Sequence, residues 1–165
     1  RNIKKASKQE LSLDKNIKPE DLVELFSTNR GKVLEVFSEY DYKRLNRLMY
    51  MLIYRGLAQV WGVYNDSNQL VAGCLWVKSK HRWILLFSGL SELGKNLSAM
   101  HYLIDEFVKT YAGTHAILDF EGSNDPGLQR FILGFGSTIH SYQSIRVNRL
   151  SALSKLLITI YKKLK

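Results

Sequence analysis

The sequence predicts a single domain of the α/β (α+β) class, in which helices flank a mixed central sheet. Its 165 residues are enough to bury one substantial core but few for two. Apolar residues make up 45% and charged residues 24%, as in ordinary globular proteins. The middle of the chain has the periodicity of strands, and the segments on both sides have the periodicity of helices. We therefore treat residues 1–165 as one domain.

The first third of the chain is predicted to contain a short strand and two helices. Residues 2–9 look like the end of a helix, and residues 11–15 are predicted to form a short strand. Pro19 suits the first turn of a helix over about 20–28, because its fixed φ fits there and its missing N–H needs no acceptor. The segment 41–54 has an apolar stripe typical of a second helix, formed by Leu45, Leu48, Met49, Leu52 and Ile53.

Three short runs rich in β-branched and aromatic residues follow, over residues 57–64, 70–79 and 82–89. The polar loops between them are short enough for hairpins, so we expect three consecutive antiparallel strands. Each run contains one tryptophan, and we expect these three to pack against the sheet rather than to form a stacking platform for a ligand; they are Trp61, Trp76 and Trp83.

The last third of the chain returns to helical spacing over residues 97–111, where Gly113 ends the pattern. The apolar run at 115–120 predicts a strand that is covered on both faces. A short helix over 127–133, a strand over about 138–147 and an amphipathic helix over 150–164 complete the predicted order.

Charge and cysteine content restrict the classes of partner. The net charge is +9, from 24 basic and 15 acidic residues, which favours anionic partners such as a nucleotide, tRNA or an acidic envelope precursor, although solvated helix faces explain it equally well. No RRM, KH or zinc-finger pattern predicts sequence-specific nucleic-acid binding. Cys74 has no partner cysteine and sits in an apolar run, so we expect a buried, inert thiol and no metal site.

Membrane insertion is not expected from the sequence. Charges interrupt every apolar stretch well before the roughly 18 residues that a spanning helix needs. No signal-peptide pattern opens the chain. We therefore expect a basic protein without a membrane span in the cytoplasm.

Two segments resemble a known family. The sequence DFEGS at 119–123 is followed by GLQRFILGFG at 127–136 and by Tyr142. This order is similar to the end of FemAB-like and "acetyltransferase 6" domains, in which a strand ending in D-F-x-G precedes a short helix, F-G and a tyrosine. The order of predicted elements also resembles the GNAT N-acyltransferase fold, whose sheet opens into a cleft between neighbouring strands.

The resemblance implies an N-acyltransferase or aminoacyltransferase that transfers an acyl group to an amine. It implies acyl-CoA or aminoacyl-tRNA as donor. His81, His101 and His115 show no ligand spacing for zinc, so we expect no metal. It also implies that this chain is the second half of a longer protein, whose first half is another GNAT-like unit.

The donor-binding loop of GNAT enzymes is expected at the stretch SELGKNLSAM, 91–100. Amides and a cation there can hold pyrophosphate, which makes five residues candidates: Gly94, Lys95, Asn96, Leu97 and Ser98. The spacing differs from the R/Q-x-x-G-x-G/A pattern of GNAT enzymes, and the lysine of the F-K-x-x-F-G pattern of Fem enzymes is replaced by Ile132.

The candidate catalytic residues follow from the needs of acyl transfer, which requires a base for the amine and an acid for the leaving group. Asp119 and Glu121 are two apart and would share one strand face. Glu121 is the preferred base, and Tyr142 is the candidate acid. Ser123 and Asn124 are candidate substrate contacts, because loops after strands meet ligands in α/β sheets.

Each of these residues also has a structural interpretation. Asp119 is expected to anchor a turn or a strand by hydrogen bonds, and Tyr142 can fill the edge of a core. The unmatched donor motif leaves a second class open, a non-catalytic GNAT-like module that binds an anionic ligand or a partner domain. A third class is direct, charge-driven binding of nucleic acid.

Overall fold

The computed structural model describes residues 2–34, 37–122, 125–145, 147 and 149–163. They divide into two compact units, residues 1–124 and 125–165. The helices of the first unit are α1 (Asn2–Ala6), α2 (Pro19–Phe26), the π-helical turn η1 (Ser27–Gly31), α3 (Lys32–Leu34), α4 (Glu39–Tyr54), α5 (Glu92–Leu97) and α6 (Ala99–Tyr111). The second unit contains α7 (Pro126–Leu133) and α8 (Ala152–Lys163).

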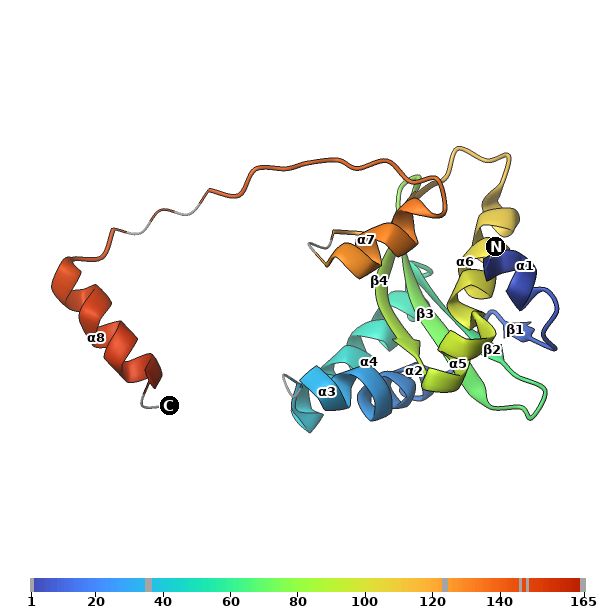
Figure 1. The fold of residues 1–165 in the computed structure, drawn as a ribbon, viewed down its shortest axis with the longest axis horizontal. Helices are drawn as coiled ribbons and strands as arrows, with labels where there is room; N and C mark the ends of the chain where they lie inside the picture. The colour runs from blue at the N-terminus through green and yellow to red at the C-terminus, as the bar shows by residue number, and fades with distance from the viewer. Residues whose placement is uncertain (1, 35–36, 123–124, 146, 148, 164–165) are drawn as a thin grey trace. The chain divides into compact units, whose positions relative to one another are not determined.

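A five-stranded mixed sheet organises the first unit (Figure 1). Its strands are β1 (Ser12–Asp14), β2 (Ala58–Tyr64), β3 (Leu70–Ser79), β4 (Arg82–Leu90) and β5 (Ile117–Asp119). They lie in the order β1-β2-β3-β4-β5, and only β4 and β5 are parallel. The predicted fold class and the three antiparallel strands are therefore confirmed.

One face of the sheet is shaped by a row of three glycines. Gly62, Gly73 and Gly89 lie opposite one another on β2, β3 and β4. A Cβ on Gly73 would lie 2.9 Å from Leu22 Cδ1, and one on Gly89 would lie 3.2 Å from Leu25 Cδ2. The absence of side chains therefore lets α2 pack directly on the sheet backbone.

The opposite face is covered by α6. Cys74 follows Gly73 along β3 and so points to the other face, where its Sγ lies 3.5 Å from Met100 Sδ. The Cys74 side chain is buried, and burial raises the pKa of its thiol. Trp76 stacks on Phe107 with ring centroids 3.8 Å apart, and Trp61 packs beside them. The predictions of an unreactive buried thiol and of tryptophans packed in the sheet are confirmed.

Two predicted helices have different bounds in the structure. The helix predicted over 41–54 begins at Glu39, because Ser38 and Asp41 form a reciprocal capping box. The helix predicted over 97–111 is confirmed as α6, which begins two residues later at Ala99. Ser98 adopts a left-handed conformation with φ 59°, which separates α5 from α6.

Two predicted strands also need correction. The strand predicted over 115–120 is shortened to three residues and is not covered on both faces, since Ile117 is 53% exposed. No strand forms in the described residues 138–145 and 147. The alternation of that segment is poor, and a strand needs a neighbour that supplies hydrogen bonds. None of the described helices is long and apolar enough to span a membrane.

Candidate functional site

The open edge of β4 is the first feature of the candidate site. β5 pairs only with the first three residues of β4, and the last pair joins Ile84 to Asp119. β4 continues for six more residues to Leu90, and no described strand pairs with that stretch on the β5 side. Its backbone N–H and C=O groups on that side are therefore available to an extended ligand.

A β-bulge interrupts β4 within this open stretch. The register passes from Leu75 opposite Phe87 to Trp76 opposite Leu85, so Leu86 has no counterpart on β3. Bulges disrupt the ladder and redirect backbone groups, and they are common beside active sites. No signal in the sequence pointed to this irregularity.

Asp119 and Glu121 do not share a strand face, because β5 ends at Asp119. Asp119 Oδ2 accepts a hydrogen bond from Arg82 Nη1 at 2.6 Å, and its Oδ1 accepts one from the Glu121 N–H at 2.8 Å. Glu121 has φ +61°, in the left-handed region, and its side chain is exposed. Asp119 thus has the anchoring geometry of the structural interpretation, and Glu121 lies at the turn that follows.

The stretch 91–100, where the donor-binding loop was expected, forms the helix α5 (Glu92–Leu97) rather than an open loop. The Gly94 N–H donates to Ser91 Oγ, the Lys95 N–H to the Ser91 carbonyl and the Ser98 N–H to the Lys95 carbonyl. These three amides are therefore already used within the chain. The Lys95 ammonium contacts Glu92 at 2.7 Å but is more than half exposed.

The remaining members of the candidate segment differ in exposure. Asn96 is exposed, Leu97 is partly buried and Ser98 is buried. Ser98 opens α6 without a side-chain cap, and the first N–H groups of a helix have no intrahelical acceptors. The segment therefore provides a cation at Lys95 and the N-terminus of a helix. The amides of Gly94, Lys95 and Ser98 are not free to bind a phosphate group.

The other candidates lie outside this part of the structure. Tyr142 belongs to the second unit and is 85% exposed, in an extended segment. Ser123 and Asn124 fall outside the described residues. No group of three or more His, Cys, Asp or Glu side chains in the described part of the chain is placed to hold a metal ion.

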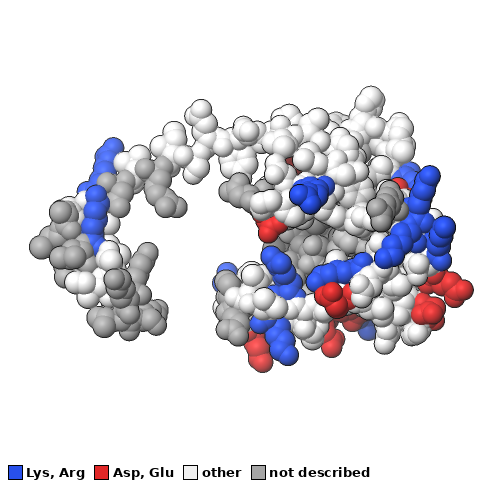
Figure 2. Space-filling view, viewed as in Figure 1, with Lys and Arg blue, Asp and Glu red and all other residues white. Residues whose placement is uncertain are grey.

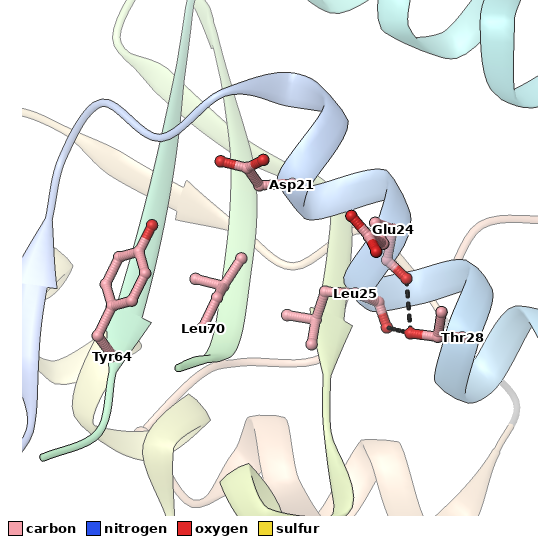
Figure 3. A pocket seen from close by; sticks show the side chains of 6 residues that line it. All are labelled: Asp21, Glu24, Leu25, Thr28, Tyr64 and Leu70. Carbon is pink, nitrogen blue, oxygen red and sulfur yellow. Dashed lines mark hydrogen bonds between the residues drawn. The ribbon is translucent and has the colours of Figure 1, made fainter. Parts of the chain in front are cut away.

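A separate open pocket of about 330 Å³ lies between α2 and the ends of β2 and β3 (Figure 3). Asp21, Glu24 and Leu25 line it from α2, and Tyr64 and Leu70 from the strands. Burial, followed by the charges of Asp21 and Asp14, raises the pKa of the Tyr64 phenol. The pocket therefore disfavours an anionic donor.

Charge is distributed unevenly but without one continuous basic surface on the face that Figure 2 shows. Basic side chains occur in several groups there, with acidic side chains among them. A nucleic-acid footprint is typically a basic patch or stripe. This face therefore adds no support to the nucleic-acid alternative.

Comparison with known proteins gives the same fold. FemX matches with a TM-score of 0.65 and 14% identity, over 79% of this chain and 51% of FemX. Ribosomal-protein-alanine N-acetyltransferase from Brucella melitensis matches with a TM-score of 0.56 and 12% identity, over 84% of this chain and 98% of that chain. A GNAT family acetyltransferase from Elizabethkingia anophelis, with acetyl-CoA bound, matches with a TM-score of 0.53 and 10% identity, over 80% of this chain and 78% of that chain.

Sequence comparison assigns the family. No curated protein is similar enough to the sequence to count as a relative. The family model described as acetyltransferase (GNAT) domain matches residues 1–126, which include the whole sheet, the open edge of β4 and the turn at Glu121. The chain therefore belongs to the acetyltransferase (GNAT) domain family.

Proposed function

We propose that this domain transfers an acyl group from an acyl thioester to an amine at the open edge of β4. The observation that carries the proposal is the unpaired stretch of β4 with its bulge at Leu86, directly beyond the last pair with β5. The extended arm of an acyl thioester donor contains amide groups. These can form hydrogen bonds with the backbone N–H and C=O groups of such an edge. Acyl-CoA is the proposed donor, and its carbonyl would accept hydrogen bonds from amides at the bulge.

Glu121 is the proposed base in this reaction. The amine nitrogen attacks the thioester carbonyl, a C–N bond forms and the C–S bond breaks. The amine proton passes to Glu121, and the thiolate that leaves takes up a proton from water or from a general acid. The role of Tyr142 as that acid stays a prediction from the sequence. Lys95, with its exposed ammonium, is the proposed contact for the donor phosphates.

Replacing Glu121 with Gln tests the base. General-base catalysis typically contributes about 10²–10⁴-fold, so turnover with acetyl-CoA and an amine panel should fall by at least about 100-fold in the full-length protein. The melting temperature should change little, since the side chain is exposed. Full activity of this variant would refute the assignment of Glu121.

A second candidate is a GNAT-like module without catalysis, and one observation favours it. The amides of Gly94, Lys95 and Ser98 are bonded within the chain, so they form no cradle for pyrophosphate. Thermal-shift titration with acetyl-CoA, longer acyl-CoAs and aminoacyl-tRNA separates the two, because a bound donor stabilises the native state in proportion to ln(1 + [L]/Kd). No shift with any of the three would favour the module.

The architecture and location of the full protein are part of the proposal. The match covers 51% of the FemX chain, which is compatible with a domain that forms part of a longer protein; the preceding GNAT-like unit stays a prediction from the sequence. A cytoplasmic location is part of the same proposal. The net charge of +9 favours an anionic donor or an acidic substrate.

A further inference from the structure

A single carboxylate links β4 to the turn that follows β5. Asp119 uses both of its oxygens, Oδ2 for the guanidinium of Arg82 at 2.6 Å and Oδ1 for the backbone N–H of Glu121 at 2.8 Å. Arg82 is the first residue of β4. The side chain therefore joins the start of one strand to the backbone beyond the end of its neighbour.

This link lies where the two strands separate. β4 and β5 share only three residue pairs, from Arg82 with Ile117 to Ile84 with Asp119. So short a ladder leaves few backbone hydrogen bonds to fix the end of β5. The charge-assisted bond from Arg82 lies beside the last pair and is stronger than a neutral hydrogen bond. It fixes the point from which the chain turns away from β4.

The backbone of Glu121 depends on this link. Its φ of +61° places a residue with a Cβ in a conformation that glycine adopts much more readily. Residues held in such conformations persist where their surroundings fix them, and they concentrate at functional sites. Here the hydrogen bond from the Glu121 N–H to Asp119 Oδ1 supplies the constraint.

The contribution of the ion pair to overall stability is small. The side chains of Arg82 and Asp119 are 50% and 28% exposed, and exposed pairs add little to the free energy of unfolding. Arg82 cannot therefore be explained as a major stabilising residue. Its geometric effect lies in the orientation of the Asp119 carboxylate, which in turn holds the turn at Glu121.

We propose that Arg82 is a positioning residue that acts through Asp119 to orient Glu121 in the turn that follows β5. This inference rests on the proposed function, in which Glu121 takes the amine proton. The contact that Arg82 makes is with Asp119, so its effect on the base is indirect. Arg82 orients the Asp119 carboxylate, and that carboxylate in turn holds the backbone of Glu121.

A double-mutant cycle tests the proposal in the full-length protein. Arg82→Gln should lower kcat for transfer from acetyl-CoA by about tenfold or more, because small displacements of a catalytic group can cost ~100-fold. KM for acetyl-CoA should stay nearly constant. In the Glu121→Gln background, Arg82→Gln should cause no further loss, and an equal loss in both backgrounds overturns the proposal.

Two further variants serve as controls. Arg82→Lys keeps the charge and should recover part of the lost kcat. Lys80→Gln removes another cation, from the hairpin turn between β3 and β4, and should leave kcat unchanged. A loss with Lys80→Gln as large as that with Arg82→Gln would mean that general charge matters, which also overturns the proposal.

Hydrogen exchange of the Glu121 amide separates this inference from the proposed function. Arg82→Gln and Asp119→Asn should both accelerate exchange of that amide, whereas Lys80→Gln should not. Exchange that is unchanged in both variants overturns the positioning role, whatever the activity. Accelerated exchange together with unaltered turnover in Glu121→Gln would instead refute the base while supporting the link from Arg82 to the turn.

Discussion

Gly94 of α5 lies so close to the carbonyl oxygen of Val71 on β3 that a Cβ at Gly94 would overlap with that oxygen. Its N–H is bonded to Ser91 Oγ at 3.0 Å. Gly94 therefore holds α5 against the sheet, a structural requirement that is distinct from donor binding.

Replacing Gly94 with Ala should destabilise the protein. The overlap with a backbone atom cannot be relieved by a side-chain rotation, so α5 must shift, and overpacking of this kind costs about 1–3 kcal/mol. Chemical denaturation would measure the loss. Asn96→Ala is the matched control on the exposed side of α5, and a similar loss in both variants would contradict the close packing as the cause.

Lys95→Ala tests the donor-phosphate contact. We expect KM for acetyl-CoA to rise by about fivefold to tenfold, because charged hydrogen bonds contribute roughly 1.5–3 kcal/mol when well formed and less when exposed. kcat should change little, since Lys95 would bind donor and transition state equally. Steady-state kinetics measures both. Glu92→Gln, which releases Lys95 from its ion pair, should not raise KM, and a rise would contradict the assignment.

His101 is expected to make the free energy of unfolding depend on pH. Burial lowers its pKa below the ordinary value of 6.5, so the unfolded chain binds the proton more tightly than the folded chain. The stabilisation is present above pH 6.5 and is lost as pH falls through the lower folded pKa. Urea denaturation between pH 8 and pH 5 should show the loss.

Substitution isolates this contribution from the other titrating groups. His101→Gln should flatten the fall in unfolding free energy between pH 6.5 and pH 5. His115→Gln replaces an exposed histidine and should leave the profile as it is. An unchanged profile in His101→Gln would rule out burial of His101 as the source.

Phe107 is expected to be the most sensitive position of α6. Its ring contacts Trp61, Trp76 and Trp83 and is fully enclosed, and truncation of a buried Phe to Ala typically costs about 3–5 kcal/mol. Thermal and urea denaturation measure the loss. Val108→Ala changes the exposed side of the same helix and should cost less than about 1 kcal/mol; a comparable loss there would contradict the packing argument.

The elements that sequence predicted correctly are those with a strong local periodicity. The strands β2 to β4 alternate or form continuous apolar runs, and α4 has a clear apolar stripe with a glycine after it. The break at Ser98 was missed because a serine with positive φ has no signature in the sequence. The strand at 138–147 was wrong because its expected pairing partner is not a local property of the sequence.

The candidate site was predicted only in part. The segment 119–123 was identified from the sequence, and the turn at Glu121 falls within it. Two acidic residues spaced by two suggested a shared strand face, but the ladder stops at Asp119 and its carboxylate bends the backbone instead. Arg82 lies 37 residues from Asp119, so no local pattern links them. The bulge at Leu86 depends on registry between two strands, which an isolated strand sequence does not specify.

The tryptophans packed around Phe107 also give the protein a selective optical signal. All three tryptophans of the sequence are on β2, β3 and β4, inside the unit of residues 1–124. Intrinsic tryptophan fluorescence therefore measures the unfolding of that unit alone and does not detect the unfolding of residues 125–165. A difference between a fluorescence melt and a far-ultraviolet circular dichroism melt would measure how far the two units unfold independently.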